Sequence, residues 1–301
     1  MNLNEQFLTK NGVTICYETQ GDATNQPLLL IMGLGVQMIG WSQGLIDKLI
    51  EAGFYVIRFD NRDVGRSTHF HHVAPPTLPQ ILGSIYMQRP IPTAYTMADM
   101  ASDAARLLDH LDIESAHVAG VSMGGMIAQR FALDFPHRTH SLASIMSTTG
   151  ERDLPRPTQR ATRVLLRKAP RYLNKYLEHS YSGYAALSGS RHPVTREDIY
   201  RVARAGFMRG RDPRGIGRQM AAIANTPGRR QALGQLTVPA VVVHGDEDEL
   251  VPYACGIDTA KAIPNCDLVT ILGMGHTLPP TMWDQLVRAI HSVAAKTDGE
   301  N

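Results

Sequence analysis

The stretch His117-Val-Ala-Gly-Val-Ser-Met-Gly-Gly-Met-Ile-Ala-Gln-Arg-Phe131 decides the fold. Its first five residues form an apolar run typical of a strand, and a helical pattern begins directly after Ser122. The serine is therefore predicted at the apex of a sharp turn, where its hydroxyl is held exposed. Gly120 and Gly124 flank it, and we expect glycine at both positions because any side chain would collide across the turn.

The rest of the chain repeats this alternation of strand and helix. Residues 5–9 and 13–19 predict a hairpin, and residues 73–92 a Pro-rich loop. Buried strands are expected at residues 28–32, 55–59, 141–146, 240–244 and 268–272, and helices at residues 41–52, 97–111 and 282–295. The alternation predicts an α/β protein with a mostly parallel central sheet flanked by helices. Ligands should bind beyond the carboxyl ends of its strands.

One segment, residues 151–230, interrupts this alternation and is here called the basic segment. It holds eighteen Lys and Arg against six Asp and Glu, so it carries +12 and the remainder of the chain −10 of the net +2. Its sequence has helical character and no clear strand. We therefore expect residues 1–150 and 231–301 to form the core and the basic segment to form an inserted helical cap, or lid, over the binding edge.

The cations of the basic segment have more than one interpretation. They could pair with acidic residues of the core, or they could attract an anionic substrate. Nucleic acid and acidic lipid are the other partners that such charge can attract, and the sequence favours neither. The paired arrangement and the attraction of anionic substrates both stay open at this point.

Two later loops supply the partners that a nucleophilic serine needs. A serine hydroxyl attacks only when a base takes its proton, and histidine is the usual base, oriented by an acid. His244-Gly-Asp-Glu-Asp-Glu-Leu-Val-Pro252 follows one buried strand, and Leu272-Gly-Met-Gly-His276 follows another. The order serine, acid, histidine is the order found on sheets of this type.

These motifs resemble the α/β-hydrolase fold superfamily over nearly the whole chain. The turn Gly120-Val-Ser-Met-Gly124 is similar to its nucleophile elbow, Gly245 to Asp248 with Pro252 to its acid loop, and Gly273-Met-Gly-His276 to its terminal histidine motif. The stretches Arg58-Phe-Asp-Asn-Arg-Asp-Val-Gly-Arg-Ser67 and Gly273-Met-Gly-His-Thr-Leu-Pro279 resemble the bacterial carboxylesterase branch that includes aclacinomycin methylesterase.

The resemblance implies a catalytic triad. Ser122 would be the nucleophile, His276 the general base and Asp248 the acid. For the acid, Asp246 is the nearest competitor. Some members of the superfamily place the acid after the preceding strand, which would point to Glu151 or Asp153.

The oxyanion hole needs two backbone donors aimed at the developing negative charge. The N–H of Met123 is one candidate, because it follows the serine. By the resemblance, the other is the N–H of Leu34 in Met32-Gly-Leu-Gly35. Met32 stands where the superfamily usually has histidine, so the loop should pack differently, although a backbone donor does not depend on that side chain.

The expected function is therefore that of a serine esterase that works through an acyl-enzyme and needs neither cofactor nor metal. Its substrate would be a small-molecule ester, and an anionic ester is one of the open alternatives. Carbon–carbon hydrolases, perhydrolases and acyltransferases share the triad and remain alternatives, as does a non-catalytic receptor for a small ligand. Dehalogenases and epoxide hydrolases of this fold use a carboxylate nucleophile, so Ser122 argues against both.

Two polar clusters have other interpretations. His69-Phe-His-His72 resembles a metal-binding tract, but no acid or cysteine is spaced along the sequence to complete a site, so a solvated loop is expected. Asp60, Arg62, Asp63 and Arg66 are expected to form an internal network that fixes their own loop.

Apolar runs, the first residues and the cysteines indicate where the protein is expected in the cell. No apolar run approaches the length that spans a bilayer, and the first residues lack the pattern of a secretory signal, so a cytoplasmic protein without integral membrane association is expected. The three cysteines, Cys16, Cys255 and Cys266, are far apart and predicted to be reduced thiols, buried or half-buried.

Overall fold

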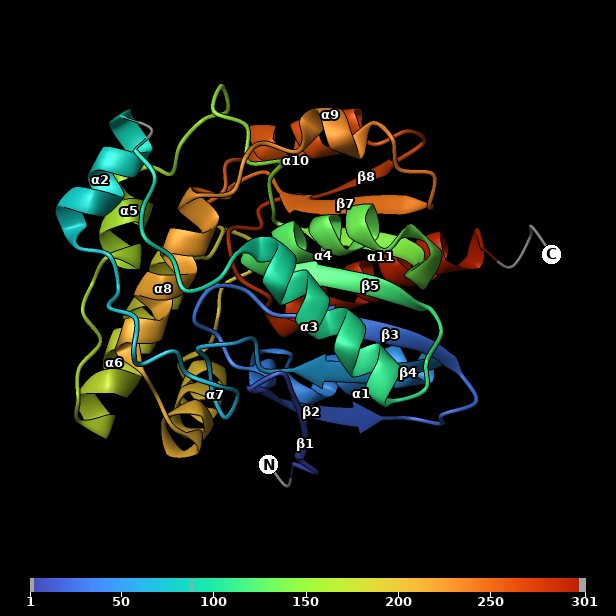
Figure 1. Cartoon of the computed structure of the whole chain (residues 1–301), viewed down its shortest axis with the longest axis horizontal. Coiled ribbons are helices and arrows are strands. Elements are labelled where there is room, and N and C mark those ends of the chain that lie inside the picture. The colour runs from blue at the N-terminus through green and yellow to red at the C-terminus, as the bar shows by residue number, and fades with distance from the viewer. Residues whose placement is uncertain (1–2, 88, 298–301) are drawn as a thin grey trace.

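A computed structural model describes residues 3–87 and 89–297, and it contains one eight-stranded sheet between layers of helices (Figure 1). Six strands from β3 to β8 run parallel, and the pairs β1–β2 and β2–β4 are antiparallel. In sheet order the strands are β1 (Gln6–Lys10), β2 (Val13–Gln20), β4 (Phe54–Phe59), β3 (Gln26–Ile31), β5 (Ala116–Val121), β6 (Thr139–Ile145), β7 (Ala240–Gly245) and β8 (Asp267–Ile271). The predicted mostly parallel α/β sheet is confirmed.

Helices cover both faces of the sheet, which explains why its central strands are apolar throughout. Along β3, Leu28 and Leu30 pack with one group of helices, α1 (Gln43–Glu51) and α11 (Trp283–Ala295). Their neighbours Leu29 and Ile31 pack with α3 (Met97–His110) and α4 (Met123–Asp134) on the other face. Alternate residues therefore serve two separate apolar cores. The remaining core helix, α10 (Tyr253–Ala262), follows β7.

The opening hairpin forms as predicted. Gln6–Lys10 pairs with the start of β2 in antiparallel register. The two turn residues, Asn11 and Gly12, have φ values of 53° and 74°, which the tightest hairpin turns require.

Residues 73–92 differ from the predicted loop, because they contain the helix α2 (Leu78–Met87). Its start is stabilised by Gln80, whose Oε1 accepts from both the N–H and the hydroxyl of Thr77. Pro79 lies in the first turn, where a proline costs no hydrogen bond. The prolines that suggested a loop are therefore compatible with a helix that begins among them.

Four helices of the basic segment lie between β6 and β7 in the chain and gather with α2 beyond one end of the sheet (Figure 1). They are α5 (Gln159–Leu165), α6 (Leu173–Leu187), α7 (Arg196–Arg209) and α8 (Pro213–Ala224), and the short α9 (Arg230–Leu233) leads back to the core. Three of them begin with a side-chain cap, from Thr158, Thr195 and Asp212, which satisfies N–H groups that the helix leaves free. The helical character expected of this segment is confirmed.

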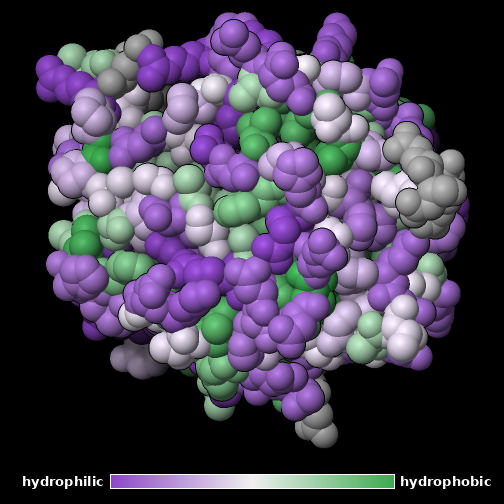
Figure 2. All heavy atoms as spheres, turned by 45° about the vertical axis from the view of Figure 1, so that its right-hand side comes forward, coloured by the Kyte–Doolittle hydropathy of each residue, from purple (hydrophilic) through white to green (hydrophobic). Residues whose placement is uncertain are grey.

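Large hydrophobic side chains are exposed at several positions, among them Phe7, Leu166 and Leu272. Figure 2 shows hydrophilic residues over most of the face drawn there, with hydrophobic patches between them. Among the residues that the structure describes, none of the helices has the length and apolar character that a bilayer span needs.

A buried ion pair joins two strands across the sheet. Glu18 of β2 lies opposite Arg58 of β4, and the Nε and Nη2 atoms of Arg58 donate to Glu18 Oε2 at 2.9 and 2.6 Å. Both side chains are almost fully buried. Burial by itself raises the pKa of Glu18, but the charge and hydrogen bonds of Arg58 more than offset it, so the pKa lies below its ordinary value.

Replacing Glu18 by glutamine should therefore destabilise the fold strongly. The Glu18→Gln change leaves the Arg58 guanidinium buried without a counter-ion, which costs about 3–5 kcal/mol of unfolding free energy. Urea unfolding at pH 7 measures this, with Asp134→Asn as the control. Asp134 pairs with Arg130 at the surface, so its loss should cost under about 1 kcal/mol.

The Glu18 effect should also depend on pH. A carboxyl with a lowered folded pKa stabilises the protein above its unfolded pKa of about 4.3 and loses that contribution as the pH falls through the folded value. The difference between wild type and Glu18→Gln should therefore shrink below about pH 4. Equal small losses in Glu18→Gln and Asp134→Asn at pH 7 would contradict the importance of this pair.

Candidate active site

Ser122 occupies the strained turn between β5 and α4. Its φ and ψ are 56° and −119°, a conformation that residues other than glycine rarely adopt. Two hydrogen bonds with the end of β6 and the loop that follows it hold the serine in this conformation. The Ser122 N–H donates to the carbonyl of Ile145 at 2.9 Å, and the hydroxyl of Ser147 donates to the Ser122 carbonyl at 2.8 Å.

Glycine is required on both sides of the serine because the backbone approaches too closely for a side chain. A Cβ atom on Gly120 would lie 2.1 Å from the carbonyl oxygen of Gly124. One on Gly124 would lie 2.1 Å from the carbonyl oxygen of Ile31, at the end of β3. The sequence prediction for these two positions is confirmed, and the second contact presses the start of α4 against the neighbouring strand.

Ser122, His276 and Asp248 form one chain of hydrogen bonds. The Nε2 atom of His276 lies 3.0 Å from Ser122 Oγ, and its Nδ1 lies 2.7 Å from Asp248 Oδ2. The side chain of Asp248 is inaccessible to solvent and that of His276 is 9% exposed. The three residues follow β5, β8 and β7, so they meet at the carboxyl edge of the sheet, as the parallel topology predicts.

The carboxylate of Asp248 is held from its other side by the backbone. Its Oδ1 accepts from the N–H groups of Leu250 and Val251, both at 2.9 Å. These bonds fix the carboxylate so that its Oδ2 faces His276 Nδ1.

His244 is a neighbour of this acid that sequence reasoning treated only as the end of a strand. Its Nε2 donates to the carbonyl of Val251 at 2.8 Å and lies 3.6 Å from Asp248 Oδ2. Burial lowers the pKa of His244, which keeps the ring neutral, and its Nδ1 has no hydrogen-bond partner in the described part of the chain. The signal that could have found it is a polar residue closing an otherwise apolar strand.

The competing acids have other partners. Asp246 Oδ1 accepts a hydrogen bond from the N–H of Gly273 at 2.6 Å. It therefore supports the backbone of the histidine loop and not the His276 ring. Glu151 Oε1 accepts from the Arg230 N–H, and Asp153 is exposed and pairs with the Arg230 side chain. Of the four acids considered, the described contacts join only Asp248 to His276.

The loop proposed for the oxyanion hole lies beside the serine. Gly33 is so near that an added Cβ would lie 3.3 Å from Ser122 Cβ. Met32, the departure from the superfamily pattern, is buried in the core, and its carbonyl accepts from Asn61 Nδ2 at 2.8 Å. Across the described residues, neither the N–H of Leu34 nor that of Met123 donates to a protein acceptor. Both are therefore free to bind a ligand.

Backbone contacts from the basic segment, which sequence reasoning did not predict, support the histidine loop. The His276 N–H donates to the carbonyl of Leu187 at 2.7 Å, and the Arg191 N–H donates to that of Gly273 at 3.1 Å. Gly189 approaches so closely that a Cβ would lie 2.1 Å from the Gly273 oxygen. The basic segment thus contacts the histidine loop at the last residue of α6 and just beyond it, where Ser188-Gly-Ser190 is a recognisable turn signal.

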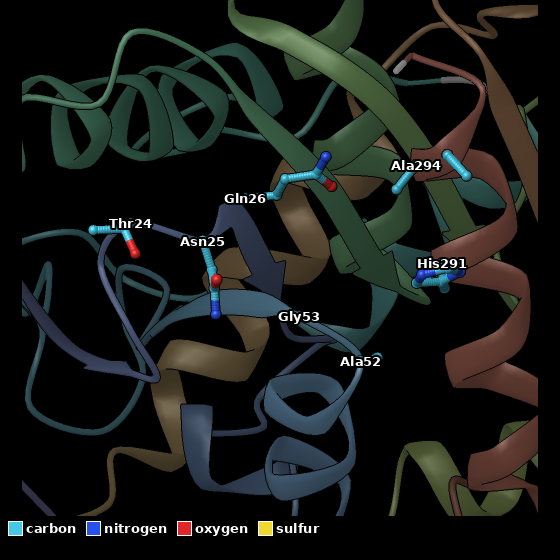
Figure 3. A pocket seen from close by; sticks show the side chains of 8 residues that line it. Thr24, Asn25, Gln26, Ala52, Gly53, His291 and Ala294 are labelled. Carbon is cyan, nitrogen blue, oxygen red and sulfur yellow. The ribbon is translucent and has the colours of Figure 1, made fainter. Parts of the chain in front are cut away.

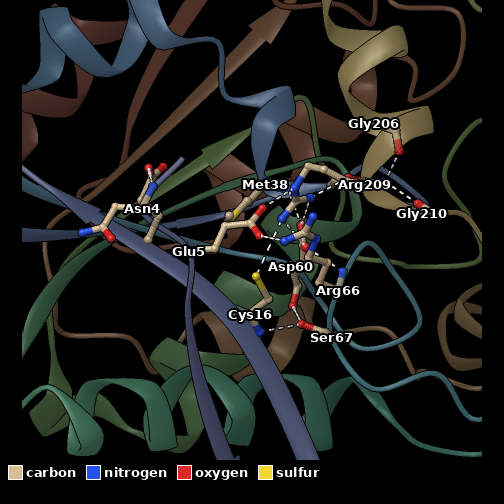
Figure 4. A network of polar contacts seen from close by, with 12 residues as sticks. Asn4, Glu5, Cys16, Met38, Asp60, Arg66, Ser67, Gly206, Arg209 and Gly210 are labelled. Carbon is tan, nitrogen blue, oxygen red and sulfur yellow. Dashed lines mark hydrogen bonds and ion pairs between the residues drawn. The ribbon is translucent and has the colours of Figure 1, made fainter. Parts of the chain in front are cut away.

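Cations of the basic segment pair with acids of the core. Arg209 Nη2 binds Asp60 at 2.9 Å and its Nε binds Glu5 at 2.6 Å, in the network of Figure 4. Arg218 binds Asp63, Arg160 binds Glu249 and Arg230 binds Asp258. These contacts support the paired interpretation for part of the charge.

The thiol of Cys16 lies beside the same network, 3.7 Å from Arg209 Nη2. Burial and then the charge of Asp60 raise the pKa of Cys16 to about 12, so the thiol stays protonated and unreactive. Cys255 is also buried and Cys266 half-buried, and all three are free. The prediction of reduced, buried or half-buried thiols is confirmed.

The charged loop after β4 is only in part a network of its own, which corrects the sequence prediction. Within it, the Arg66 N–H donates to Asp60 Oδ2 at 3.0 Å. Arg62 donates to Asp103 of α3 at 2.6 and 2.8 Å, and Asp63 accepts from Arg218 of α8 and from the hydroxyl of Tyr95. The loop is therefore fixed also by partners from other elements, which only the tertiary fold brings close.

The histidine tract also differs from its prediction. His69 is half-buried, and it lies about 4 Å from both Asp63 and Asp212, although His71 is exposed as expected. The side chains of Asp63, His69 and Asp212 are close enough together to bind a cation. The guanidinium of Arg218 already donates to both carboxylates at 2.6 and 2.7 Å, so a positive charge is present without a metal.

A separate pocket lies at the opposite edge of the sheet. It is lined by Thr24 to Gln26 at the start of β3, by Ala52 and Gly53 before β4, and by His291, Ala294 and Ala295 of α11 (Figure 3). None of these residues belongs to the loops that hold Ser122, Asp248 and His276.

Known proteins share this fold and sequence pattern. The α/β hydrolase fold family model matches residues 26–193. Rhodomycin D methylesterase DauP from Streptomyces sp. (strain C5) is 29% identical over 96% of this chain and 98% of its own. A carboxylesterase structure from Nitrososphaera gargenis has a TM-score of 0.72 at 23% identity, covering 97% of this chain and 100% of its own. The meta-cleavage product hydrolase CumD from Pseudomonas fluorescens has a TM-score of 0.72 at 19% identity, covering 97% of each chain.

The two structures agree with this chain in fold, and the methylesterase agrees in sequence along almost its full length. The family match spans more than half of the chain, from β3 through the serine turn and into the basic segment. The chain therefore belongs to the α/β hydrolase fold family.

Proposed function

We propose that this protein hydrolyses carboxylic esters through an acyl-enzyme on Ser122. The observation that carries the proposal is the hydrogen-bonded chain from Ser122 Oγ through His276 to Asp248, with a buried carboxylate at its end. The similarity to a methylesterase over nearly the full length of both chains supports an ester as the substrate class.

In the first half of the reaction, Ser122 Oγ attacks the ester carbonyl while His276 Nε2 accepts its proton. The carbonyl oxygen becomes an oxyanion, and the free N–H groups of Leu34 and Met123 stabilise it. The positive end of α4 also favours this charge, because the helix begins at Met123. His276 then returns the proton to the leaving alcohol as the carbon–oxygen bond breaks.

In the second half, water replaces the alcohol. His276 takes a proton from the water, whose oxygen attacks the acyl carbon, and the same two N–H groups hold the second oxyanion. Collapse breaks the bond to Ser122 Oγ, which regains its proton from His276, and the acid leaves. Asp248 keeps Nδ1 protonated and stabilises the imidazolium in both halves.

The helices of the basic segment would act as a cap over this edge. Support comes from their direct contacts with the site, through Leu187 to the histidine loop and through α8 to the loop of Leu34. In this arrangement the cap and α2 shape the space that accepts a small-molecule ester.

Other reactions on the same triad remain the main alternatives. Carbon–carbon hydrolases, perhydrolases and acyltransferases use the same three residues, and the geometry at Ser122 does not favour one of them over ester hydrolysis. A non-catalytic receptor would not need the three-residue hydrogen-bond chain, which argues for an enzyme.

Replacing the nucleophile should abolish turnover without unfolding the protein. Ser122→Ala removes the attacking oxygen, so kcat for p-nitrophenyl esters from acetate to decanoate should fall by roughly 10⁴-fold or more. Release of p-nitrophenol measures this, and circular dichroism checks the fold. Substantial residual hydrolysis by a folded Ser122→Ala protein would exclude this serine as the nucleophile.

The acid can be distinguished from its competitor by a matched pair of variants. Asp248→Asn should lower kcat by about 10³- to 10⁴-fold, because the amide no longer fixes the imidazole tautomer. Asp246→Asn should cost far less, since Asp246 contacts the Gly273 N–H and not His276. Steady-state kinetics on one ester decides between them, and the reverse ranking would show that the acid is misassigned.

The remaining charge of the basic segment predicts a preference for anionic esters. Arg163, Lys168, Arg171 and Lys175 are exposed and make no ion pair with any described residue. The kcat/KM ratio of p-nitrophenyl hemisuccinate to p-nitrophenyl pentanoate should therefore fall as ionic strength rises from about 0.01 to 1 M, where the screening length shrinks from about 30 to 3 Å. Lys168→Gln with Arg171→Gln should reduce the ratio at low salt. A kcat/KM ratio that does not change with salt would show that the cations do not attract the substrate.

A further inference from the structure

The loop that would hold the oxyanion is a tight turn with two N–H groups that the turn itself does not use. The Val36 N–H closes the turn on the carbonyl of Gly33 at 3.2 Å, which leaves the N–H groups of Leu34 and Gly35. The φ of Gly35 is 67°, as the third residue of a type II turn requires. Such turns can flip their central peptide, here the one joining Leu34 to Gly35.

A side chain from the basic segment accepts a hydrogen bond from one of these two N–H groups, that of Gly35. Gln219 of α8 lies over the turn, and its Oε1 accepts from the Gly35 N–H at 2.8 Å. Its Nε2 donates to the carbonyl of Arg62 at 2.9 Å. Gln219 is completely buried, and its amide has only one orientation that satisfies both partners, because one is a donor and the other an acceptor.

The helix that carries Gln219 is anchored independently of this bond. Ile216 packs so closely on Gly35 that a Cβ there would lie 2.7 Å from its Cγ1 atom. Arg218 pairs with Asp63 and Asp212, and Asn225 at the end of α8 exchanges two hydrogen bonds with the backbone of Ile91. Removing the Gln219 amide should therefore leave α8 in place.

We propose that Gln219 is a positioning residue for the oxyanion hole. Its bond to the Gly35 N–H fixes the peptide after Leu34, and the Val36 N–H bond to the Gly33 carbonyl holds the peptide before it. With both neighbouring peptides fixed, the Leu34 N–H keeps one direction. This inference rests on the proposed function for its catalytic consequence. It makes the basic segment part of the catalytic geometry as well as a cover for the substrate.

The expected effect is on the chemical step. Preorganised donors act in the transition state, and small displacements of catalytic groups are costly. Gln219→Leu should therefore lower kcat for p-nitrophenyl butyrate by about 10- to 100-fold, with KM changed less than about threefold. Gln219→Met, which keeps an unbranched side chain, is a second variant in case Gln219→Leu does not fold.

Asn225→Leu is the matched control. It removes a two-bonded amide from the same helix, but its partner is Ile91 and not the turn. It should lose stability like Gln219→Leu while keeping kcat within about threefold of wild type. An unchanged kcat in both Gln219 variants, or an equal fall in Asn225→Leu, would overturn the positioning role.

Hydrogen exchange at the Gly35 amide, followed by NMR, tests the same role without turnover. Exchange should be at least about tenfold faster in Gln219→Leu than in wild type or Asn225→Leu, because the amide loses its acceptor. Unchanged exchange would overturn the proposal. If wild type shows no Ser122-dependent hydrolysis, the proposed function fails, and this measurement alone decides the role of Gln219.

Discussion

The contact between Gly124 and the carbonyl of Ile31 is the constraint on which the site depends. It brings the start of α4 against the end of β3 with room for a hydrogen atom only. The same approach forces Ser122 into its strained conformation and sets the loop of Leu34 beside it. The two N–H groups proposed for the oxyanion hole thus come from two elements that are pressed together, so their spacing is determined by backbone packing rather than by flexible side chains.

The basic segment contributes to the site through hydrogen bonds as much as through charge. The carbonyl of Leu187 at the end of α6 accepts a hydrogen bond from the His276 N–H, and Gln219 of α8 accepts one from the Gly35 N–H. Buried ion pairs such as Arg218 with Asp63 anchor the basic segment to the core between these two contacts. A cap fastened on both sides of the nucleophile would have little freedom to open near the triad, so substrate entry would depend on parts of the cap that lie farther from these contacts.

The sequence predicted the parallel sheet and the serine turn well, because apolar runs and the spacing of Gly120 and Gly124 depend on local geometry. Topology predicted that the loops after β7 and β8 share one edge of the sheet, and the family resemblance pointed to Asp248 and His276 within them. The sequence did not predict the partners of Asp63 or the position of Gln219, since these contacts join residues far apart in the chain. The α2 helix was missed because prolines mark loops and first helical turns equally. The orientation of His244 could not be predicted, because it depends on how the acid loop folds back to place the carbonyl of Val251 beside the ring.

The most direct test of the central claim is labelling with a fluorophosphonate, a reagent that is selective for activated serine nucleophiles. Intact-mass and peptide mass spectrometry would identify the modified residue. The account predicts one covalent adduct on Ser122, with labelling strongly slowed by His276→Ala. Absence of labelling in the folded protein, or an adduct on a different residue, would contradict it.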